Sequence, residues 1–162
     1  MFINTAVLLS LVGLASATAV PRQSSPFGRL HPYEKGTELC VAASEPTVGA
    51  IVGLVKCHAS TDEGSKLELY NITNSGTYNK QRIALQAYPG LCLDGGARAQ
   101  ASDQITLQRC DKPNSTNGQL ISYSTAGYLS FQNTYCFHKK SDSEIDIQSC
   151  FLMNQEIVFY PS

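Results

Sequence analysis

The chain has 162 residues, of which 43% are hydrophobic, and its 12 basic and 13 acidic side chains give a net charge of −1. This length predicts one domain with a hydrophobic core, and the balanced charge argues against nucleic acid or anionic membranes as main partners. Only 15% of the residues are charged, so uncharged polar residues and Gly must complete the surface, which suits an extracellular protein.

The first segment in chain order is a predicted secretory signal. Residues 6–14 form an apolar run that is followed by small residues, with cleavage expected after Ala17 or Ala19. The run is too short to span a bilayer, which needs about 20 apolar residues. Because the leading segment has no Lys or Arg, a buried N-terminal helix is the alternative. We predict a signal peptide at 1–19 and a linker or short pro-segment at 20–29.

Secretion would place the chain in an oxidising compartment, where disulfides form and persist. No second long apolar stretch follows the signal, so we expect no membrane span. Asn71 and Asn114 begin Asn-x-Thr and Asn-x-Ser/Thr sequons, which predicts N-glycosylation. The six Cys allow about 15 connectivities; they lie at Cys40, Cys57, Cys92, Cys110, Cys136 and Cys150.

The Cys residues mark an internal repeat. Neighbouring Cys pairs enclose 16, 17 and 13 residues. Apolar residues recur five and three positions before the second Cys of each pair, at Val52 and Leu54, Ile105 and Leu107, and Ile145 and Ile147. This alternation is typical of a half-buried strand. The self-similarity predicts three copies of about four short strands, at about 30–75, 76–124 and 125–162.

A related motif closes each repeat. Residues 119–123 (QLISY) match residues 155–159 (QEIVF), and residues 66–70 (KLELY) are a looser copy whose register could slip by one. We therefore predict a threefold, all-β fold. Pairing within each repeat gives one disulfide per hairpin, Cys40–Cys57, Cys92–Cys110 and Cys136–Cys150, each stabilising by about 3 kcal/mol on the chain-entropy model. Pairing between repeats is the alternative, and it would break the symmetry.

The Cys pairs also predict which residues share the outer face of each hairpin. If the two Cys face each other in antiparallel strands, three further pairs lie opposite each other and away from the core: Asp94 with Gln108, His138 with Gln148, and Ala42 with Val55. Repeat two then presents a polar pair with a carboxylate, and repeat one has no polar pair. The alternative role of Asp94 is to cap the turn at Gly95-Gly96.

These features resemble the ricin B-type β-trefoil lectins. The resemblance covers about residues 30–162, and its most specific pieces are the LCLD run at 91–94 with Cys110 and Gln119, and Cys136 and Cys150 with Asn154-Gln155. The closing motif of that family is Gln-x-Trp, whereas this chain has no Trp and places Ile121 and Ile157 there. The resemblance implies a β-trefoil of three four-strand repeats.

The resemblance also implies a carbohydrate-binding site in a repeat. In that family an Asp just after the first Cys holds sugar hydroxyls, an aromatic two residues before the second Cys stacks on the sugar, and an Asn-Gln before the closing motif adds hydrogen bonds. The carried-over residues of repeat two are Asp94 and Gln119, with Gly118 replacing the Asn and Gln108 replacing the aromatic. Those of repeat three are Asn154 and Gln155, with His138 replacing the Asp and Gln148 replacing the aromatic.

The function implied is that of a secreted, non-catalytic lectin that binds carbohydrates or glycoprotein glycans without cofactor or metal. Tyr88 or Tyr123 could supply the missing aromatic face, although both also fit core or turn positions. The alternative is a secreted β-trefoil inhibitor or interaction protein that acts through loops 73–82 or 111–118, because one fold hosts both activities.

Enzyme and metal functions find less support in the sequence. Zinc-ligand spacings and a Gly-x-Ser-x-Gly elbow are absent. Residues 141–146 lack the Gly and distal Glu of a calcium loop, and Glu144 and Asp146 alternate with apolar residues as on a solvated strand face. Paired carboxylates of a glycoside hydrolase could still meet in space, but the repeats leave no room for a catalytic domain.

Overall fold

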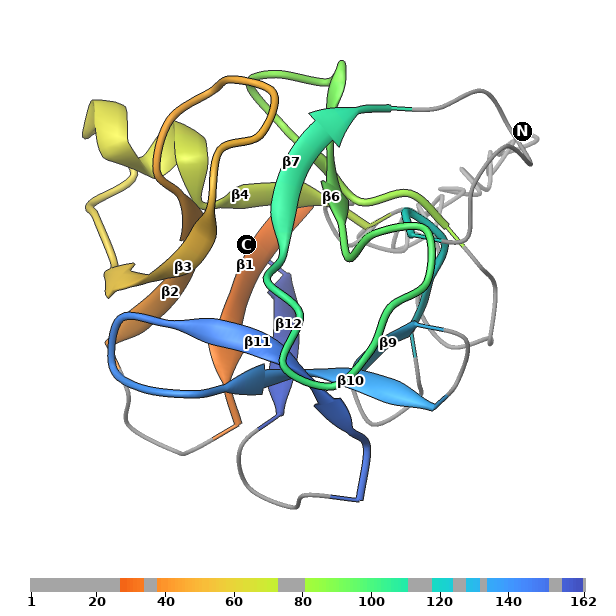
Figure 1. Cartoon of the computed structure of the whole chain (residues 1–162). Coiled ribbons are helices and arrows are strands. Elements are labelled where there is room, and N and C mark those ends of the chain that lie inside the picture. Colours follow the sequence, from red (N-terminus) through yellow and green to blue (C-terminus); the bar gives the residue numbers. More distant parts are fainter. Residues whose placement is uncertain are drawn as a thin grey trace, which may run out of the picture.

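Twelve strands follow one another along the chain, four in each repeat (Figure 1). The computed structural model describes residues 27–33, 38–72, 81–110, 118–123, 128–131, 134–151 and 156–161. Repeat one comprises β1 (Phe27–Pro32), β2 (Leu39–Ala43), β3 (Val52–Lys56), the 3-10 helix η1 (Glu63–Leu67) and β4 (Leu69–Asn71). Repeat two comprises β5 (Ala84–Leu85), β6 (Leu91–Asp94), β7 (Thr106–Arg109) and β8 (Ile121–Tyr123). Repeat three comprises β9 (Leu129–Phe131), β10 (Tyr135–Lys139), β11 (Ile145–Ser149) and β12 (Ile157–Pro161).

The N-terminal boundary of the domain differs from the expected one. Strand β1 starts at Phe27, three residues before the predicted start at residue 30, because residues 27–29 pair with β4. The remaining part of the predicted linker and the predicted signal peptide at 1–19 lie outside the described residues.

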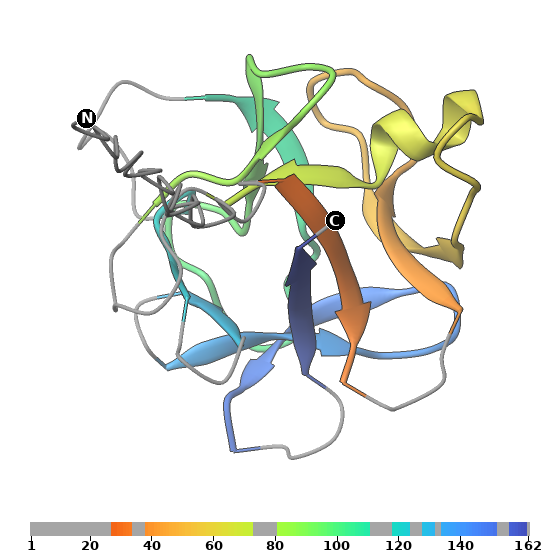
Figure 2. The same ribbon diagram turned by 180° about the vertical axis from the view of Figure 1, so that it is seen from behind.

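The first and last strands of the repeats close a barrel. β1 pairs with both β12 and β4, and Figure 2 shows β1 and β12 side by side. β4 pairs with β5, and β8 pairs with β9. Bridges between Gln81 and Ile121 and between Tyr128 and Val158 join the remaining neighbours. Every described strand of this ring therefore has a partner on each side, and no edge of the ring is open.

The middle strands of each repeat form hairpins that cap the barrel: β2–β3, β6–β7 and β10–β11. The hairpins are joined to one another by bridges from Ile51 to Thr106 and from Gly53 to Glu144. The third junction is a hydrogen bond from Ser102 N to Ile147 O, at 2.7 Å. Gly53 is required at its junction because a Cβ there would lie 2.6 Å from Ser143 O. Hairpins of different repeats thus form one continuous cap.

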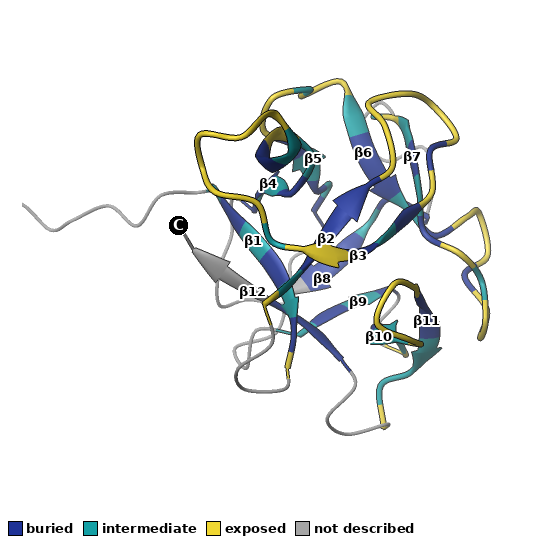
Figure 3. Cartoon of the chain, turned by 90° about the vertical axis from the view of Figure 1, so that its left-hand side faces the viewer, coloured by how far each residue is buried: buried dark blue, intermediate teal, exposed yellow. Residues whose placement is uncertain are grey.

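The core occupies equivalent positions in the three repeats, and Figure 3 shows the buried residues gathered in the strands. The first strands of repeats one and three contribute Leu30 and Leu129, and Ile83 directly precedes the first strand of repeat two; none of the three has exposed surface. The alternating positions before the second Cys are buried as predicted, at Val52, Leu54, Ile105, Leu107, Ile145 and Ile147. Each such side chain stabilises the fold by about 1.5–3 kcal/mol relative to an exposed one. Apolar alternation in the sequence thus identified the inner face correctly.

The three predicted disulfides are present, Cys40–Cys57, Cys92–Cys110 and Cys136–Cys150. The predicted strand register, however, is wrong by two residues in each hairpin. Asp94 lies opposite Thr106 and not Gln108, His138 lies opposite Asp146 and not Gln148, and Ala42 lies opposite Gly53 and not Val55.

The cause of this error is the position of the second Cys. Cys110 lies beyond the end of β7, and its backbone N–H donates to Gly90 O. The disulfide therefore crosses the hairpin diagonally instead of joining directly opposed residues. Because side chains alternate with a period of two, a shift of two residues leaves every side chain on its predicted face.

The closing motif of repeat one also has a different register. Ile121 pairs with Phe131 and Ile157 pairs with Pro32, and the equivalent pairing in repeat one is Tyr70 with Leu85. The copy of Gln119-Leu120-Ile121 is therefore Glu68-Leu69-Tyr70, a slip of two residues relative to the expected alignment. Tyr70, Ile121 and Ile157 have no exposed surface, so all three fill the core where the lectin family has Trp.

Candidate functional site

A hollow of about 690 Å³ lies on the outer face of repeat two, and we call it the repeat-two hollow. Its polar lining consists of Asp94, Asp103, Gln104, Thr106, Gln108 and Gln119, with Arg109 beside them. The lining comes from the end of β6, from β7 and from the segments that precede β7 and β8. The structure thus brings the three predicted residues of repeat two, Asp94, Gln108 and Gln119, into one hollow.

Asp94 is held at both carboxylate oxygens. Oδ1 accepts a hydrogen bond from Gly96 N at 2.6 Å, and Oδ2 accepts one from Gln119 Nε2 at 3.0 Å. Asp94 therefore caps the Gly95-Gly96 turn, as in the alternative reading, and also faces the hollow. Since a carboxylate oxygen has two acceptor sites, each oxygen can still accept a hydrogen bond from a ligand.

The second partner of the Asp94 carboxylate, Gln119, holds it from the buried side. The Gln119 side chain is almost fully buried, and Nε2 also donates to Arg109 O at 2.9 Å. Both amide protons are thus engaged with the protein. Gln119 Nε2 therefore holds the carboxylate of Asp94, and the same side chain lines the repeat-two hollow.

The residue opposite Asp94 is Thr106, which sequence reasoning missed because the predicted register was shifted. Gln108 lies on the same face, and its Nε2 lies 3.3 Å from Thr106 Oγ1. Both side chains are half-buried and line the repeat-two hollow. A hydroxyl, an amide and a carboxylate therefore converge on one face of the β6–β7 hairpin.

Gly118 replaces the Asn of the lectin family for a steric reason. A Cβ at Gly118 would lie 2.3 Å from Gly96 O and 2.6 Å from Asp94 Oδ1. The two segments are also joined by a hydrogen bond from Gly95 N to Gly118 O at 2.9 Å. This close approach allows no side chain, so the local backbone here requires glycine.

None of the described residues that line the repeat-two hollow is aromatic. Tyr88 packs against the hydrophobic core, and the side chain of Tyr123 lies outside the described part of the structure. The largest apolar side chain of the lining is Val48, which is 52% exposed and comes from repeat one. An aliphatic surface from a neighbouring repeat thus stands near the polar groups.

Repeat three has a different polar cluster at the equivalent face. His138 Nδ1 lies 2.8 Å from Asp146 Oδ1, and Gln148 Nε2 lies 3.0 Å from Asp146 Oδ2. Asp146 is 4% exposed, so the expected solvated strand face is wrong at this residue, whose carboxylate is held between the His138 ring and the Gln148 amide. Asn154 and Gln155 lie outside the described residues.

Repeat one carries no polar site on this face, as expected, since Ala42 is buried and lies opposite Gly53. Its charged cluster lies at the closing motif instead. The carboxylate of Glu68 has no exposed surface; it forms an ion pair with Arg29 at 3.3 Å, contacts the ring of His58 and accepts from His58 N at 3.1 Å. Glu68 thus occupies in repeat one the position that Gln119 occupies in repeat two, but it forms an ion pair with Arg29.

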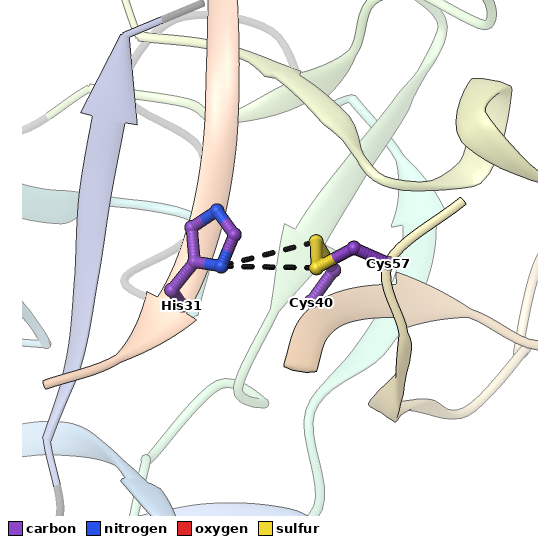
Figure 4. Close-up of side chains that lie close together, drawn as sticks. All are labelled: His31, Cys40 and Cys57. Atoms are coloured by element: carbon purple, nitrogen blue, oxygen red, sulfur yellow. Dashed lines mark hydrogen bonds between the residues drawn. A yellow bond between two sulfur atoms is a disulfide. The ribbon is translucent and has the colours of Figure 1, made fainter. Parts of the chain in front are cut away.

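His31 lies against the disulfide of repeat one, as Figure 4 shows. Its Nδ1 is 3.9 Å from Cys40 Sγ, 3.8 Å from Cys57 Sγ and 2.9 Å from Leu39 O. Burial lowers the pKa of His31, so the neutral ring donates to the Leu39 carbonyl. Among the described residues, His31, Cys40 and Cys57 form a group whose possible metal-ligand atoms lie close to one another. The two sulfurs are joined in a disulfide, however, and so offer no thiolate to a metal.

The predicted modification sites and loops are only partly described. Asn71 lies in β4 between β1 and β5, and its Oδ1 is buried without a hydrogen-bond partner in the described part of the chain. Asn114 lies outside the described residues, as does most of loops 73–82 and 111–118. Among the described residues there is no helix with the length and apolar character needed to cross a membrane.

Comparison with solved structures identifies the fold. The β-trefoil lectin of the Vibrio vulnificus hemolysin/cytolysin, solved with N-acetyl-D-lactosamine bound, matches with a TM-score of 0.61 at 16% identity over 84% of this chain and 93% of the lectin. GalNAc-T7, solved with UDP, GalNAc and Mn²⁺, matches with a TM-score of 0.58 at 17% identity over 83% of this chain and 22% of that protein. A mosquitocidal holotoxin matches with a TM-score of 0.58 at 17% identity over 86% of this chain and 17% of the toxin.

No family model matches the chain, and no curated protein matches it by sequence. The chain spans less than a quarter of GalNAc-T7 and of the holotoxin, but nearly all of the hemolysin lectin. At these identities the likeness concerns the fold. The chain is a β-trefoil with one disulfide in each repeat, as the sequence predicted.

Proposed function

We propose that this β-trefoil is a secreted, non-catalytic carbohydrate-binding protein whose main site is the repeat-two hollow. The observation that carries the proposal is the Asp94 carboxylate, fixed by Gly96 N and Gln119 Nε2 at the border of the hollow. A carboxylate held in this way can accept hydrogen bonds from two adjacent sugar hydroxyls. A bound N-acetyl-D-lactosamine in the similar hemolysin lectin supports this ligand class.

The side chains around Asp94 complete the proposed sugar site. Gln108 and Thr106 can donate to or accept from further hydroxyls, and Val48 offers an apolar surface for the C–H face of the ring. An aliphatic contact stabilises less than an aromatic one because it lacks the quadrupole of a π-face. We therefore propose weak binding of a glycan at this site, with affinity raised when several copies of the glycan are presented.

Repeat three is proposed as a second and weaker site. There Asp146 supplies the carboxylate from β11, while His138 stands at the position of Asp94. Asp146 is engaged by His138 and Gln148 and is nearly buried, so less of it is available to a ligand. The roles of Asn154 and Gln155 in this site rest on the family resemblance alone.

Secretion is supported by the three disulfides, which suit an oxidising compartment, and by the predicted signal. The experiment that tests the function is glycan-array binding followed by calorimetric titration of the best ligand. Asp94→Ala should weaken binding by about tenfold or more, since a hydrogen bond to a charged group contributes about 1.5–3 kcal/mol.

The matched control is Glu63→Ala, which removes an exposed carboxylate of η1 that does not line the hollow. It should leave binding unchanged. The proposal is overturned if no glycan binds the folded protein, or if Asp94→Ala and Glu63→Ala bind equally well. Inhibition of a protease by the same preparation would instead favour the alternative of an inhibitory trefoil.

A further inference from the structure

A second, smaller hollow of about 140 Å³ adjoins the repeat-two hollow. Gln104 lines both of them, and apart from Gln104 and Ser102 of repeat two the smaller hollow is bounded by residues of the other two repeats, among them Ile51, Lys140, Glu144 and Asp146. The two hollows are therefore neighbours on the cap. We call the surface that runs from Asp94 in repeat two, past the shared residue Gln104, to Asp146 in repeat three the path.

This path is built on a fixed backbone. In Figure 1 the connection between β6 and β7 extends toward β11, where Ser102 N donates to Ile147 O at 2.7 Å and Ile147 N donates to Asp103 O at 3.1 Å. Ser102 adopts a positive φ of 73°, which a residue without glycine's freedom holds only when its surroundings impose it. Gln104 thus projects from an anchored segment and is exposed between the two hollows.

The exposed aliphatic residues of the path come from one repeat and its amides and carboxylates from the other two. Val48 borders the repeat-two hollow and Ile51 borders the smaller one, with 52% and 51% of their surfaces exposed. Both belong to repeat one, whereas the amides and carboxylates of the two hollows belong to repeats two and three. A carbohydrate chain has the same division, with C–H faces that pack on apolar side chains and hydroxyls that hydrogen-bond to polar ones.

The charged residues along the path favour neutral carbohydrates over anionic ones. The carboxylates outnumber the cations, with Asp94, Asp103, Glu144 and Asp146 against Arg109 and Lys140. Lys140 is itself paired with Glu144 at 3.0 Å. An anionic glycan would meet a net negative surface and be repelled, whereas a neutral glycan would not.

We propose that the two hollows form one extended site for a neutral oligosaccharide of several residues, crossing from repeat two to repeat three past Gln104. This inference rests on the proposed function, and it adds the length and the charge of the ligand. The volume of the repeat-two hollow falls within the range of about 300–1,000 Å³ of sites for larger organic ligands. A single sugar ring at Asp94 would leave Gln104, Ile51 and the smaller hollow unused.

The test is calorimetric titration of the full mature chain with galactose, with N-acetyl-D-lactosamine, and with the linear tetrasaccharide of two N-acetyl-D-lactosamine units. A sialylated form of the tetrasaccharide reports the effect of charge. Affinity should rise from monosaccharide to tetrasaccharide and fall on sialylation. Ile51→Ser should weaken tetrasaccharide binding by about two- to tenfold and leave galactose binding unchanged, whereas Gln104→Ala should weaken tetrasaccharide binding more than galactose binding.

The control variant is Val55→Ser, because Val55 is an exposed aliphatic residue of the same hairpin that lines neither hollow. Thermal unfolding of each variant shows that the fold is retained. Equal affinity for galactose and tetrasaccharide, lost in both cases on Asp94→Ala, would overturn the extended site but keep the proposed function. Failure of every saccharide to bind would overturn both.

Discussion

Gly118 leaves no room for a side chain beside Asp94, since a Cβ atom there would lie 2.6 Å from Asp94 Oδ1. The β-trefoil lectins that this chain resembles have Asn at this position. The same Cβ atom would lie 2.3 Å from Gly96 O, so the Gly95-Gly96 segment occupies the space that a side chain at residue 118 would need. The glycine at residue 118 and the shape of the turn after β6 therefore depend on each other.

Restoring the family residue should consequently harm the protein. We predict that Gly118→Asn lowers the thermal stability by about 1–3 kcal/mol, the usual cost of forced overpacking, and weakens glycan binding by displacing Asp94. Differential scanning calorimetry and glycan titration measure the two effects. Gly90→Asn is the matched control, because a Cβ at Gly90 meets no atom within 4 Å. A Gly118→Asn variant of normal stability and tighter binding would contradict the steric account.

Gln119 should matter for stability as well as for binding. Gln119→Ala removes the two hydrogen bonds to Asp94 Oδ2 and Arg109 O. Leaving a buried acceptor unsatisfied costs about 1–3 kcal/mol, and the loss should appear in urea denaturation at neutral pH. Glycan affinity should fall too, while Gln108→Ala, at a half-buried residue of the same hollow, should lower affinity with little effect on stability. Equal stability losses in the two variants would argue against a positioning role for Gln119.

Glu68 should be the most sensitive charged residue of repeat one. Glu68→Ala leaves Arg29 without its ionic partner and should destabilise the protein by about 3–5 kcal/mol, the cost of breaking a buried ion pair. Glu68→Gln should cost less, because an amide can still accept from His58 N. Chemical denaturation of both variants provides the comparison. If Glu68→Gln were as stable as the unchanged protein, the ionic contacts of Glu68 would contribute little.

His31 should make the protein less stable in mild acid. Burial lowers the pKa of His31 in the folded state, whereas the unfolded ring titrates near about 6.5. The unfolded chain therefore binds more protons below that pH, and stability should fall as the pH drops from about 6.5 toward the folded pKa. The slope should be smaller in His31→Gln, and NMR titration of the ring should give a value below that of a free histidine. An identical slope in both proteins would exclude His31 as its source.

The sequence was sufficient for the repeats, the core and the disulfides because these depend on local patterns. Ile145 and Ile147 face inward simply because they alternate along a strand, and the spacing of the Cys residues repeats with them. The strand register could not be predicted from such local patterns. Nothing in the residues near Cys110 indicates that it lies beyond the strand end, where a diagonal disulfide replaces a directly opposed one.

Local sequence patterns also failed to predict the surroundings of Asp146 and Glu68. Asp146 alternates with two core residues and so was expected to face solvent, but Ser102, 44 positions earlier, contacts the same face through Gln148. Glu68 was misaligned because η1 lengthens the connection before β4, and because a carboxylate there does not look like a copy of Gln119. Both residues acquire their roles from segments distant in sequence.

The pairing of β1 with β12 over five residue pairs has a consequence for chain order. The ring of repeats has no structural beginning, since the boundary between repeat three and repeat one is as continuous as the other two. A circularly permuted gene that joins residue 161 to residue 27 by a short linker and opens the chain between β4 and β5 should therefore encode the same barrel. Each disulfide would survive the rearrangement, because both of its Cys residues belong to a single repeat.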